Sequence, residues 1–202
     1  MFHKNLFKFY FAFFALLYFI IFSSSAPSSA QDVSADNNCV WYKTDKSVMW
    51  LGSADVVGMN CHIEIKPIKK GELLSFEILI PIEGFNSGSN GRDERVDEIL
   101  KSEKQPNLVF STEYMNRNYW QQLISKPEFK LNGILNISGL STKVTFHVTT
   151  DIKTCKGKFI TNYSWFKIEP PVAGPGGMVA RTRDYLELHF SVKKESIENL
   201  LH

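Results

Sequence analysis

Regular alternation of apolar and polar residues, repeated along most of the chain, is the feature that most limits the folds open to this sequence. Residues 61–66 (CHIEIK) place Cys61, Ile63 and Ile65 on one face and polar side chains on the other. Successive side chains of a strand point to opposite faces of a sheet, so this segment predicts a strand with one buried face. The same period occurs in seven more segments, around Val48 and Trp50 and in residues 74–80, 108–114, 129–137, 144–148, 159–165 and 186–192.

Eight strands with mostly short connections predict an all-β, antiparallel meander. Eight is also the strand number at which a sheet can close into a barrel, whose interior is either packed or wide enough for one ligand. A two-sheet sandwich is the alternative architecture for the same pattern. The expected fold is therefore an eight-stranded antiparallel barrel, with one short helix between the third and fourth strands.

The helix is expected where the alternation stops. Residues 84–91 contain three glycines, two asparagines and two serines, which end the preceding strand. Ser89 or Asn90 can cap a helix that follows, and Asp93 is favourable near its N-terminus. The apolar residues 96, 99 and 100 share one helical face. This pattern predicts two to three turns that cover one end of the barrel as a lid.

The first 30 residues have the pattern of a secretory signal peptide. Two lysines and an apolar run over residues 9–22 precede Ser28 and Ala30, small residues suited to cleavage before Gln31. A helix over that run would cover about 21 Å, less than the roughly 30 Å hydrocarbon core of a bilayer, so a membrane anchor is the weaker alternative. We therefore expect a mature protein that begins near Gln31 and is periplasmic or secreted.

The charge balance argues against several classes of partner. The whole chain carries 23 Lys and Arg against 21 Asp and Glu, and the expected leader holds two of the lysines and none of the acids. The remaining chain is therefore neutral, and it has no basic cluster with interleaved aromatic residues. These features argue against binding to nucleic acid or to an anionic membrane surface, and the remaining length suits one domain.

Three cysteines, Cys39, Cys61 and Cys155, allow at most one internal disulfide, with three possible pairings. An exported protein favours such a bond. Cys61 is interpreted as a small buried residue within a strand, which leaves Cys39 and Cys155 as the expected pair. Successive loops of an up-and-down barrel alternate between its ends, and this topology places Cys39 and the loop containing Cys155 at the same end.

Three stretches, taken together, resemble one known family. They are Ser47 and Val48 with Trp50 and Gly52, residues 85–100 followed by 105–112 (QPNLVFST), and residues 131–148 (LNGILNISGLSTKVTFHV). The chain is similar here to the YceI-like lipid- and polyisoprenoid-binding proteins, lipocalin-like barrels that many bacteria export. The resemblance implies a lipocalin-like barrel domain over residues 40–193, between an N-terminal extension (31–39) and a C-terminal tail (194–202).

The resemblance also implies a ligand, an isoprenoid-type lipid such as a polyisoprenoid or an isoprenoid quinone, along the barrel axis. Inward side chains would supply the contacts, although the same side chains could instead fill a core. Arg92 and Asp93 could orient a head group at the mouth; the alternative is a helix-terminal acid and a solvated arginine. The expected ligand-binding residues are Cys61, Ile63, Ile65, Phe76, Ile78, Ile80, Phe110, Phe129, Leu131, Leu135, Phe146, Phe159, Trp165, Leu188 and Phe190.

No residue set in the sequence supports catalysis or metal binding. His62, His147 and His189 fall on the polar phases of three separate strands, and no nucleophile, phosphate-loop or dinucleotide motif occurs. The protein is therefore expected not to be an enzyme and to need no cofactor. A carrier or buffer of isoprenoid lipid is the leading hypothesis, and a module with a filled core that binds another envelope protein is the alternative. The oligomeric state is left open, a homodimer included.

Overall fold

The structure, a computed structural model, describes residues 37–48, 52–174 and 177–202. These residues belong to one compact unit, Val33–His202. The expected signal peptide, its cleavage site and Trp50 of the first expected strand lie outside the described residues, so those expectations remain predictions.

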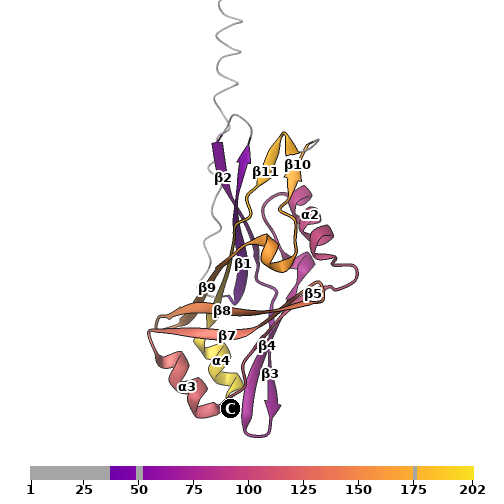
Figure 1. Ribbon diagram of the computed structural model, residues 1–202. Coiled ribbons are helices and arrows are strands. Elements are labelled where there is room, and N and C mark those ends of the chain that lie inside the picture. Colours follow the sequence, from indigo (N-terminus) through magenta and orange to yellow (C-terminus); the bar gives the residue numbers. More distant parts are fainter. Residues whose placement is uncertain (1–36, 49–51, 175–176) are drawn as a thin grey trace, which may run out of the picture. The chain divides into compact units, whose positions relative to one another are not determined.

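The described residues are built around one antiparallel sheet of 12 strands (Figure 1). Burial alternates along several of these strands as the sequence predicts: in β7, Leu131, Gly133 and Leu135 are buried while Asn132 and Ile134 between them are exposed. The strands are β1 (Cys39–Val48), β2 (Gly52–Asn60), β3 (Glu64–Lys70), β4 (Leu73–Pro81), β5 (Asn107–Thr112), β6 (Met115–Asn116), β7 (Glu128–Ile137), β8 (Leu140–Thr150), β9 (Thr154–Thr161), β10 (Val172–Ala173), β11 (Ala180–Thr182) and β12 (Leu186–Lys193).

The sheet does not close into the expected barrel. Its strands follow the order β10-β11-β1-β12-β9-β8-β7-β5-β4-β3, while β2 pairs with β1 and β6 pairs with β4. One edge of β1 pairs first with β12 and then with β11, and its other edge pairs with β2 along the whole hairpin. Strands β2 and β3 therefore carry edges that no continuous ladder joins.

A few specific contacts bridge this gap instead. Met59 in β2 and Asn86, which follows β4, exchange backbone hydrogen bonds of 3.0 and 2.8 Å. Asn60 is 1% exposed; its Nδ2 donates to the carbonyl oxygen of Pro81 (2.6 Å), and its Oδ1 accepts from the backbone nitrogen of His62 (2.7 Å). These bonds tie the end of β2 to the end of β4.

The number and bounds of the strands differ from the expected eight. The first expected strand, around Val48, is the tip of a long hairpin that pairs β1 with β2. The segment expected to run through residues 61–66 is interrupted, because β2 ends at Asn60 and β3 begins at Glu64. Two 3-10 helices, η1 (Ile82–Gly84) and η2 (Tyr163–Phe166), also replace expected strand or loop. Strands β6, β10 and β11 have only two or three residues, too few for a period to show.

Helix α2 (Asn90–Leu100) forms where the sequence predicts a helix, but it follows the fourth strand rather than the third, because the N-terminal hairpin adds a strand. Ser89 is its N-cap, and the carbonyl oxygen of Ser89 accepts from the backbone nitrogens of Arg92 and Asp93 (2.9 and 3.1 Å). The helix ends at Lys101, which adopts a left-handed φ of 58°. The apolar residues 96 and 100 pack against the core, as the helical period indicates.

Helix α3 (Arg117–Ser125) was not expected, and it lies at the opposite end of the domain from α2 (Figure 1). The side chain of Asn116 caps it by accepting from the backbone nitrogen of Tyr119 (2.8 Å). Its buried face consists of Trp120, Leu123 and Ile124, spaced as one side of a helix. This helix adds a large aromatic residue to the core.

The expected C-terminal tail is folded rather than free. Helix α4 (Lys194–Leu200) follows β12, and the backbone nitrogen of Lys194 donates to the carbonyl oxygen of Lys153 (2.8 Å). Leu201 is 1% exposed and belongs to the core. A helix this short depends on tertiary packing, and its local sequence therefore does not predict it. Within the described ranges, no helix combines the length and the apolar character needed to cross a membrane.

The expected Cys39–Cys155 disulfide is wrong, because Cys39 is bonded to Cys61 and Cys155 is a free, buried thiol. The β1–β2 hairpin pairs Val40 with Asn60, which brings the two cysteines opposite each other one position further along. The sequence did not predict this bond because it gave no clear sign of the β1–β2 hairpin. Burial raises the pKa of the Cys155 thiol to about 11, which makes it a poor nucleophile at neutral pH.

Candidate ligand-binding cavity

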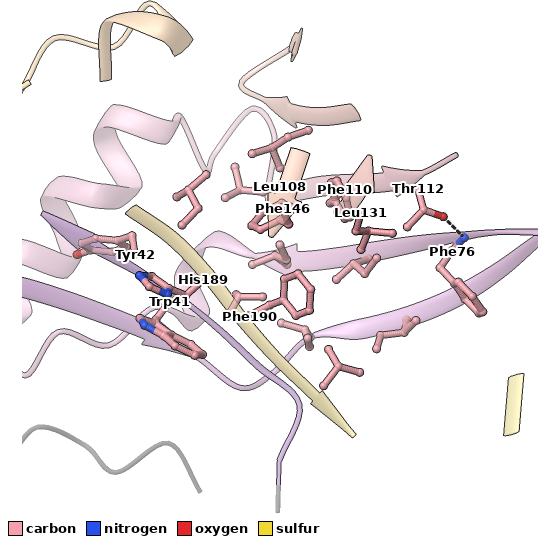
Figure 2. A pocket seen from close by; sticks show the side chains of 18 of the residues that line it. Trp41, Tyr42, Phe76, Leu108, Phe110, Thr112, Leu131, Phe146, His189 and Phe190 are labelled. Carbon is pink, nitrogen blue, oxygen red and sulfur yellow. Dashed lines mark hydrogen bonds between the residues drawn. The ribbon is translucent and has the colours of Figure 1, made fainter. Parts of the chain in front are cut away.

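The core of the domain holds an apolar cavity of about 140 Å³, which we call the inner chamber (Figure 2). Aromatic rings from three strands meet at its wall: the ring centroid of Phe146 lies 5.4 Å from that of Phe110 and 5.2 Å from that of Phe190. Both contacts are edge-on, the geometry that aromatic pairs favour. The other lining residues are Val40, Trp41, Tyr42, Ile63, Ile65, Phe76, Ile78, Ile80, Phe85, Leu108, Thr112, Trp120, Leu131, Leu135, Ile137, Leu188, His189, Val192 and Ile197.

Two strand glycines make room for these rings. A Cβ on Gly157 would lie 2.0 Å from Cε1 of Phe190, and a Cβ on Gly133 would lie 2.4 Å from Cε2 of Phe110. Glycine within a strand often marks such a close approach. The sheet therefore carries aromatic side chains against bare backbone at two points of the chamber wall.

Two buried polar groups in the wall of the inner chamber form hydrogen bonds with the backbone. Thr112 Oγ1 accepts from the backbone nitrogen of Phe76 (2.8 Å), and Trp120 Nε1 donates to the carbonyl oxygen of Leu74 (2.9 Å). Trp120 also packs edge-on against Phe76, with centroids 4.9 Å apart. A surface of this kind suits hydrocarbon, because a polar ligand group would lose its hydrogen bonds to water there.

A second cavity, of about 410 Å³, adjoins the first, and we call it the outer chamber. The apolar face of α2 lines it, together with residues of β1, η2, β10 and β11. Five residues line both chambers and form the neck between them: Tyr42, Phe85, Leu108, Ile137 and Leu188. The remaining lining residues are Thr44, Lys46, Val56, Gly91, Arg92, Arg95, Val96, Ile99, Leu100, Tyr163, Ile168, Pro171, Val172, Ala173, Ala180, Thr182 and Leu186.

The outer chamber differs from the inner one in its polar groups. Burial raises the pKa of the Tyr42 phenol, with Tyr163 and Asp93 nearby adding to the effect. Burial also raises the pKa of Tyr163. Both phenols therefore stay protonated at neutral pH and can donate hydrogen bonds. The outer chamber can thus meet a polar group as well as a hydrocarbon chain.

The sequence model of the YceI-like domain matches residues 41–193. The chain belongs to the YceI-like family. No protein with a curated description matches the sequence.

The YceI-like domain also resembles solved structures at low sequence identity. They include BcnA of Burkholderia cenocepacia (15% identity, covering 74% of this chain and 94% of that chain, TM-score 0.50) and the YceI protein of Campylobacter jejuni (17%, 69% and 84%, 0.50). A third is a polyisoprenoid-binding domain from Saccharophagus degradans (9%, 75% and 91%, 0.53). At these identities the likeness concerns the fold alone.

The YceI-like fold brings most of the expected ligand residues together, but not all of them. Cys61 is exposed and forms the disulfide, and Trp165, in η2, is 59% exposed. Phe129 and Phe159 pack against the core without lining either chamber. The expected residues that line the inner chamber are Ile63, Ile65, Phe76, Ile78, Ile80, Phe110, Leu131, Leu135, Phe146, Leu188 and Phe190.

The two expected mouth residues lie at the start of α2. Arg92 donates from Nε to Ser87 Oγ (3.0 Å) and from Nη2 to the Ser87 carbonyl oxygen (2.8 Å), while it also lines the outer chamber. Asp93 Oδ1 accepts from the backbone nitrogen of Ser87 (3.0 Å). Asp93 therefore has the structural role of the alternative interpretation, whereas Arg92 is both held by the loop and next to the cavity.

Several residues that line the two chambers were not predicted from the sequence. Tyr42 and Val40 lie on β1 on the same face as Thr44, but the pattern there is weak because most residues of this strand are only half-buried. Trp120 could have been found from the helical spacing of α3. Phe85 carries no periodic signal, because it lies in the loop before α2.

One titratable cluster is centred on Glu187 of β12, and its member His189 also lines the inner chamber. Glu187 bonds to Lys158 Nζ (2.7 Å), to His189 Nε2 (2.8 Å) and to the hydroxyl of Tyr185. His189 also stacks on Trp41, with ring centroids 5.0 Å apart. Burial lowers the pKa of His189, although Glu187 acts in the opposite direction. The cluster joins strands β1, β9 and β12 through side chains, and the sequence had indicated only that His189 was on a polar phase.

Proposed function

We propose that this YceI-like protein is an exported binding protein that holds an isoprenoid-type lipid in its interior, as a carrier or buffer. The lipid would be a polyisoprenoid or an isoprenoid quinone. The observation that carries the proposal is the pair of adjoining chambers, the inner one lined by apolar side chains from β1, β3, β4, β5, β7, β8 and β12. The similar domain from Saccharophagus degradans, described as polyisoprenoid-binding, supports the same class of ligand.

The size and surface of the chambers are consistent with a hydrocarbon chain. Each buried CH₂ contributes about 0.8 kcal/mol, so a five-carbon isoprene unit contributes roughly 3–4 kcal/mol before the cost of ordering the chain. The inner chamber, at about 140 Å³, can hold only a short chain segment, because an engineered apolar cavity of about 150 Å³ accepts one benzene-sized guest. The outer chamber, at about 410 Å³, lies within the roughly 300–1,000 Å³ usual for ligand sites. A long lipid therefore needs both.

The direct test is to identify what the protein carries. The protein is expressed with residues 1–30 intact and purified without detergent, and its organic extract is analysed by mass spectrometry. We expect a reproducible long-chain isoprenoid at a molar ratio near one, absent from an extract of an unrelated exported protein prepared in the same way. A protein that is folded and free of lipid, and that takes up none when isoprenoids are added, would refute the carrier proposal and favour a filled-core interaction module.

Export is tested separately. Intact mass of the protein recovered outside the cytoplasm should match a chain that begins near Gln31, because the leader has the charge, apolar run and small residues of a signal peptide. A product that keeps residues 1–30 and remains in the membrane fraction would contradict this part of the proposal.

A further inference from the structure

The outer chamber adjoins a third hollow, of about 470 Å³, which we call the side cleft. One wall of the side cleft comes from α2 and the β7–β8 turn, and the other comes from η2 and the segment that follows it. The exposed residues Lys101, Lys167 and Glu169 line it, so it opens at the surface. Six residues line both the side cleft and the outer chamber: Arg95, Ile99, Ile137, Ile168, Pro171 and Val172. The side cleft therefore leads from the surface to the outer chamber.

Three large apolar side chains are exposed on the β10–β11 hairpin, beside the side cleft. Val172 is 49% exposed, Met178 63% and Val179 54%, and we call them the hairpin patch. A Cβ on Gly174 would lie 2.4 Å from Val179 Cγ2, and one on Gly177 would lie 3.3 Å from Val172 Cβ, so both valines pack on backbone of their own hairpin. Val172 also lines the side cleft and the outer chamber. Single exposed apolar residues are ordinary, whereas three on one short hairpin indicate an interaction surface.

Positive charge gathers around the same openings. Among the described residues that line the outer chamber and the side cleft, the only acid is Glu169, and the cations are Lys46, Arg92, Arg95, Lys101 and Lys167. Arg95 is partly compensated by an exposed ion pair with Glu98 (2.7 Å). The neutral charge of the chain beyond its leader, which argues against an anionic membrane, is an average that conceals this local excess.

Exposed apolar side chains next to cations form the kind of surface that binds a lipid bilayer, since buried apolar area and attraction to anionic head groups both contribute to such binding. We propose that the hairpin patch and the cations of the side cleft dock this protein onto a bilayer that contains anionic phospholipid, with the side cleft facing the lipids. Docking goes beyond the proposed function, because it requires no cargo. It would also serve that function, since each CH₂ group that enters water costs about 0.8 kcal/mol and a docked cleft keeps an isoprenoid chain out of water.

Vesicle flotation tests the docking directly. The exported protein is mixed with vesicles of phosphatidylcholine, or of phosphatidylcholine and phosphatidylglycerol in equal parts, and the fraction that floats is measured over a series of lipid and salt concentrations. We expect the protein to float with the anionic vesicles and much less with the neutral ones. Salt should weaken the binding, because it screens the attraction between the cations and the head groups.

The apolar part of the surface is tested with Met178→Glu. This side chain is largely exposed, so the protein should still fold, which circular dichroism checks. The matched control is Ile152→Glu, because Ile152 is 94% exposed in the β8–β9 turn, next to the α4 end of the domain. We expect Met178→Glu to weaken vesicle binding about tenfold, as the loss of one buried apolar side chain predicts, and Ile152→Glu to bind like the wild type.

The charged part of the surface is tested with the double variant Lys101→Gln and Lys167→Gln. It should weaken binding to the anionic vesicles about 30-fold, which is about fivefold for each lysine near an anionic surface. The matched control is the double variant Lys69→Gln and Lys126→Gln, which removes two exposed lysines from β3 and the end of α3. This control should bind the vesicles as the wild type does.

Three results would overturn the proposal: folded wild-type protein that floats with neither kind of vesicle, equal effects of Met178→Glu and Ile152→Glu, or equal effects of the two lysine pairs. Binding to native membranes but not to vesicles of pure lipid would also overturn it, and would assign the hairpin patch to a protein partner. The carrier proposal fails separately: a protein that floats as expected but carries and takes up no isoprenoid would support docking and refute the carrier.

Discussion

The side-chain amide of Asn60 donates a hydrogen bond of 2.6 Å to the carbonyl oxygen of Pro81, and so joins two strands that no ladder connects. Next to it, a Cβ on Gly84 would come within 2.5 Å of Asn60 Nδ2, so the loop after β4 closes tightly over the amide. The gap between β2 and β4 is therefore held by one buried side chain and one backbone bridge.

The first prediction is that Asn60→Ala destabilises the domain. The substitution leaves the Pro81 carbonyl without its partner in a buried position, which costs about 1–3 kcal/mol in the free energy of unfolding. Asn132→Ala is the control, because Asn132 bonds Glu113 and Thr145 on the exposed face of β7 and should change stability by about 0.5 kcal/mol or less. Urea unfolding measures both. Equal effects would show that the Asn60 bond has no special role.

The second prediction concerns the face of β4. Ile78 lines the inner chamber, while Glu77 is on the opposite phase of the strand and pairs with Lys66 across the sheet. Ile78→Glu should abolish lipid co-purification, since an unpaired carboxylate in an apolar chamber is costly, whereas Glu77→Ala should retain the lipid. Mass spectrometry of the extracts gives the result, and circular dichroism confirms that each variant is folded. A folded Ile78→Glu protein with its full lipid content would contradict the cavity assignment.

The third prediction is a single disulfide between Cys39 and Cys61, with Cys155 reduced. The bond joins residues 22 positions apart, and chain entropy gives about 3 kcal/mol for a loop of this length. Replacing both Cys39 and Cys61 with Ser should lower the free energy of unfolding by about that amount, while Cys155→Ser should not remove the cross-link. Peptide mapping without reductant checks the pairing directly. Recovery of a peptide that links Cys155 to either partner would disprove it.

The fourth prediction is a loss of stability in acid that depends on Glu187. Burial favours its protonated form, but hydrogen bonds from Lys158, Tyr185 and His189 prevail and hold the pKa of Glu187 at about 2, below its ordinary 4.5. A carboxyl with a lowered pKa in the folded state stabilises the protein above the unfolded-state pKa, and this contribution is lost as pH falls through the folded-state pKa. The loss should therefore occur between pH 4.5 and 2.

Glu187→Gln should make that acid loss smaller by about 2–3 kcal/mol, although it also lowers stability at neutral pH by removing the ion pair. Urea midpoints at neutral pH and at two values within the acid window provide the comparison. Glu72→Gln, an exposed carboxyl at the β3–β4 turn, should follow the wild type. Parallel curves for wild type and Glu187→Gln would exclude Glu187 as the origin of the acid sensitivity.

Strands with one buried, apolar face could be predicted from the sequence, because the period of two is a local property of the backbone. Residues 74–80, 129–137 and 186–192 all lie within observed strands, and their apolar phases supply much of the inner chamber. The segment from Cys39 to Val48 lacks a clear dry face, since most of its residues are only half-buried. Its hairpin with β2 was therefore not recognised. The Cys39–Cys61 disulfide was not predicted either, because only the pairing of Val40 with Asn60 brings the two cysteines together.

The residues of the candidate site were likewise predicted where they lie on regular strands and were not predicted where they lie in loops. Leu188 and Phe190 could be assigned to the interior from alternation alone, but Phe85 lies in a loop, and Trp165 continued a strand pattern that the chain abandons at η2. Arg92 was expected at a mouth, whereas its bonds to Ser87 depend on how the loop folds back against α2.

By itself the sequence determined which side of each regular strand is apolar, where a helix interrupts the strands, and which family the chain resembles. Each of these properties depends on residues that are close together along the chain. Only the tertiary structure decided that the sheet stays open between β2 and β3, that Asn60 of β2 bonds the end of β4, and that Tyr42 lines both chambers. These features depend on the register of strands and loops that are distant in sequence, and register is set by how the whole core packs rather than by any local pattern.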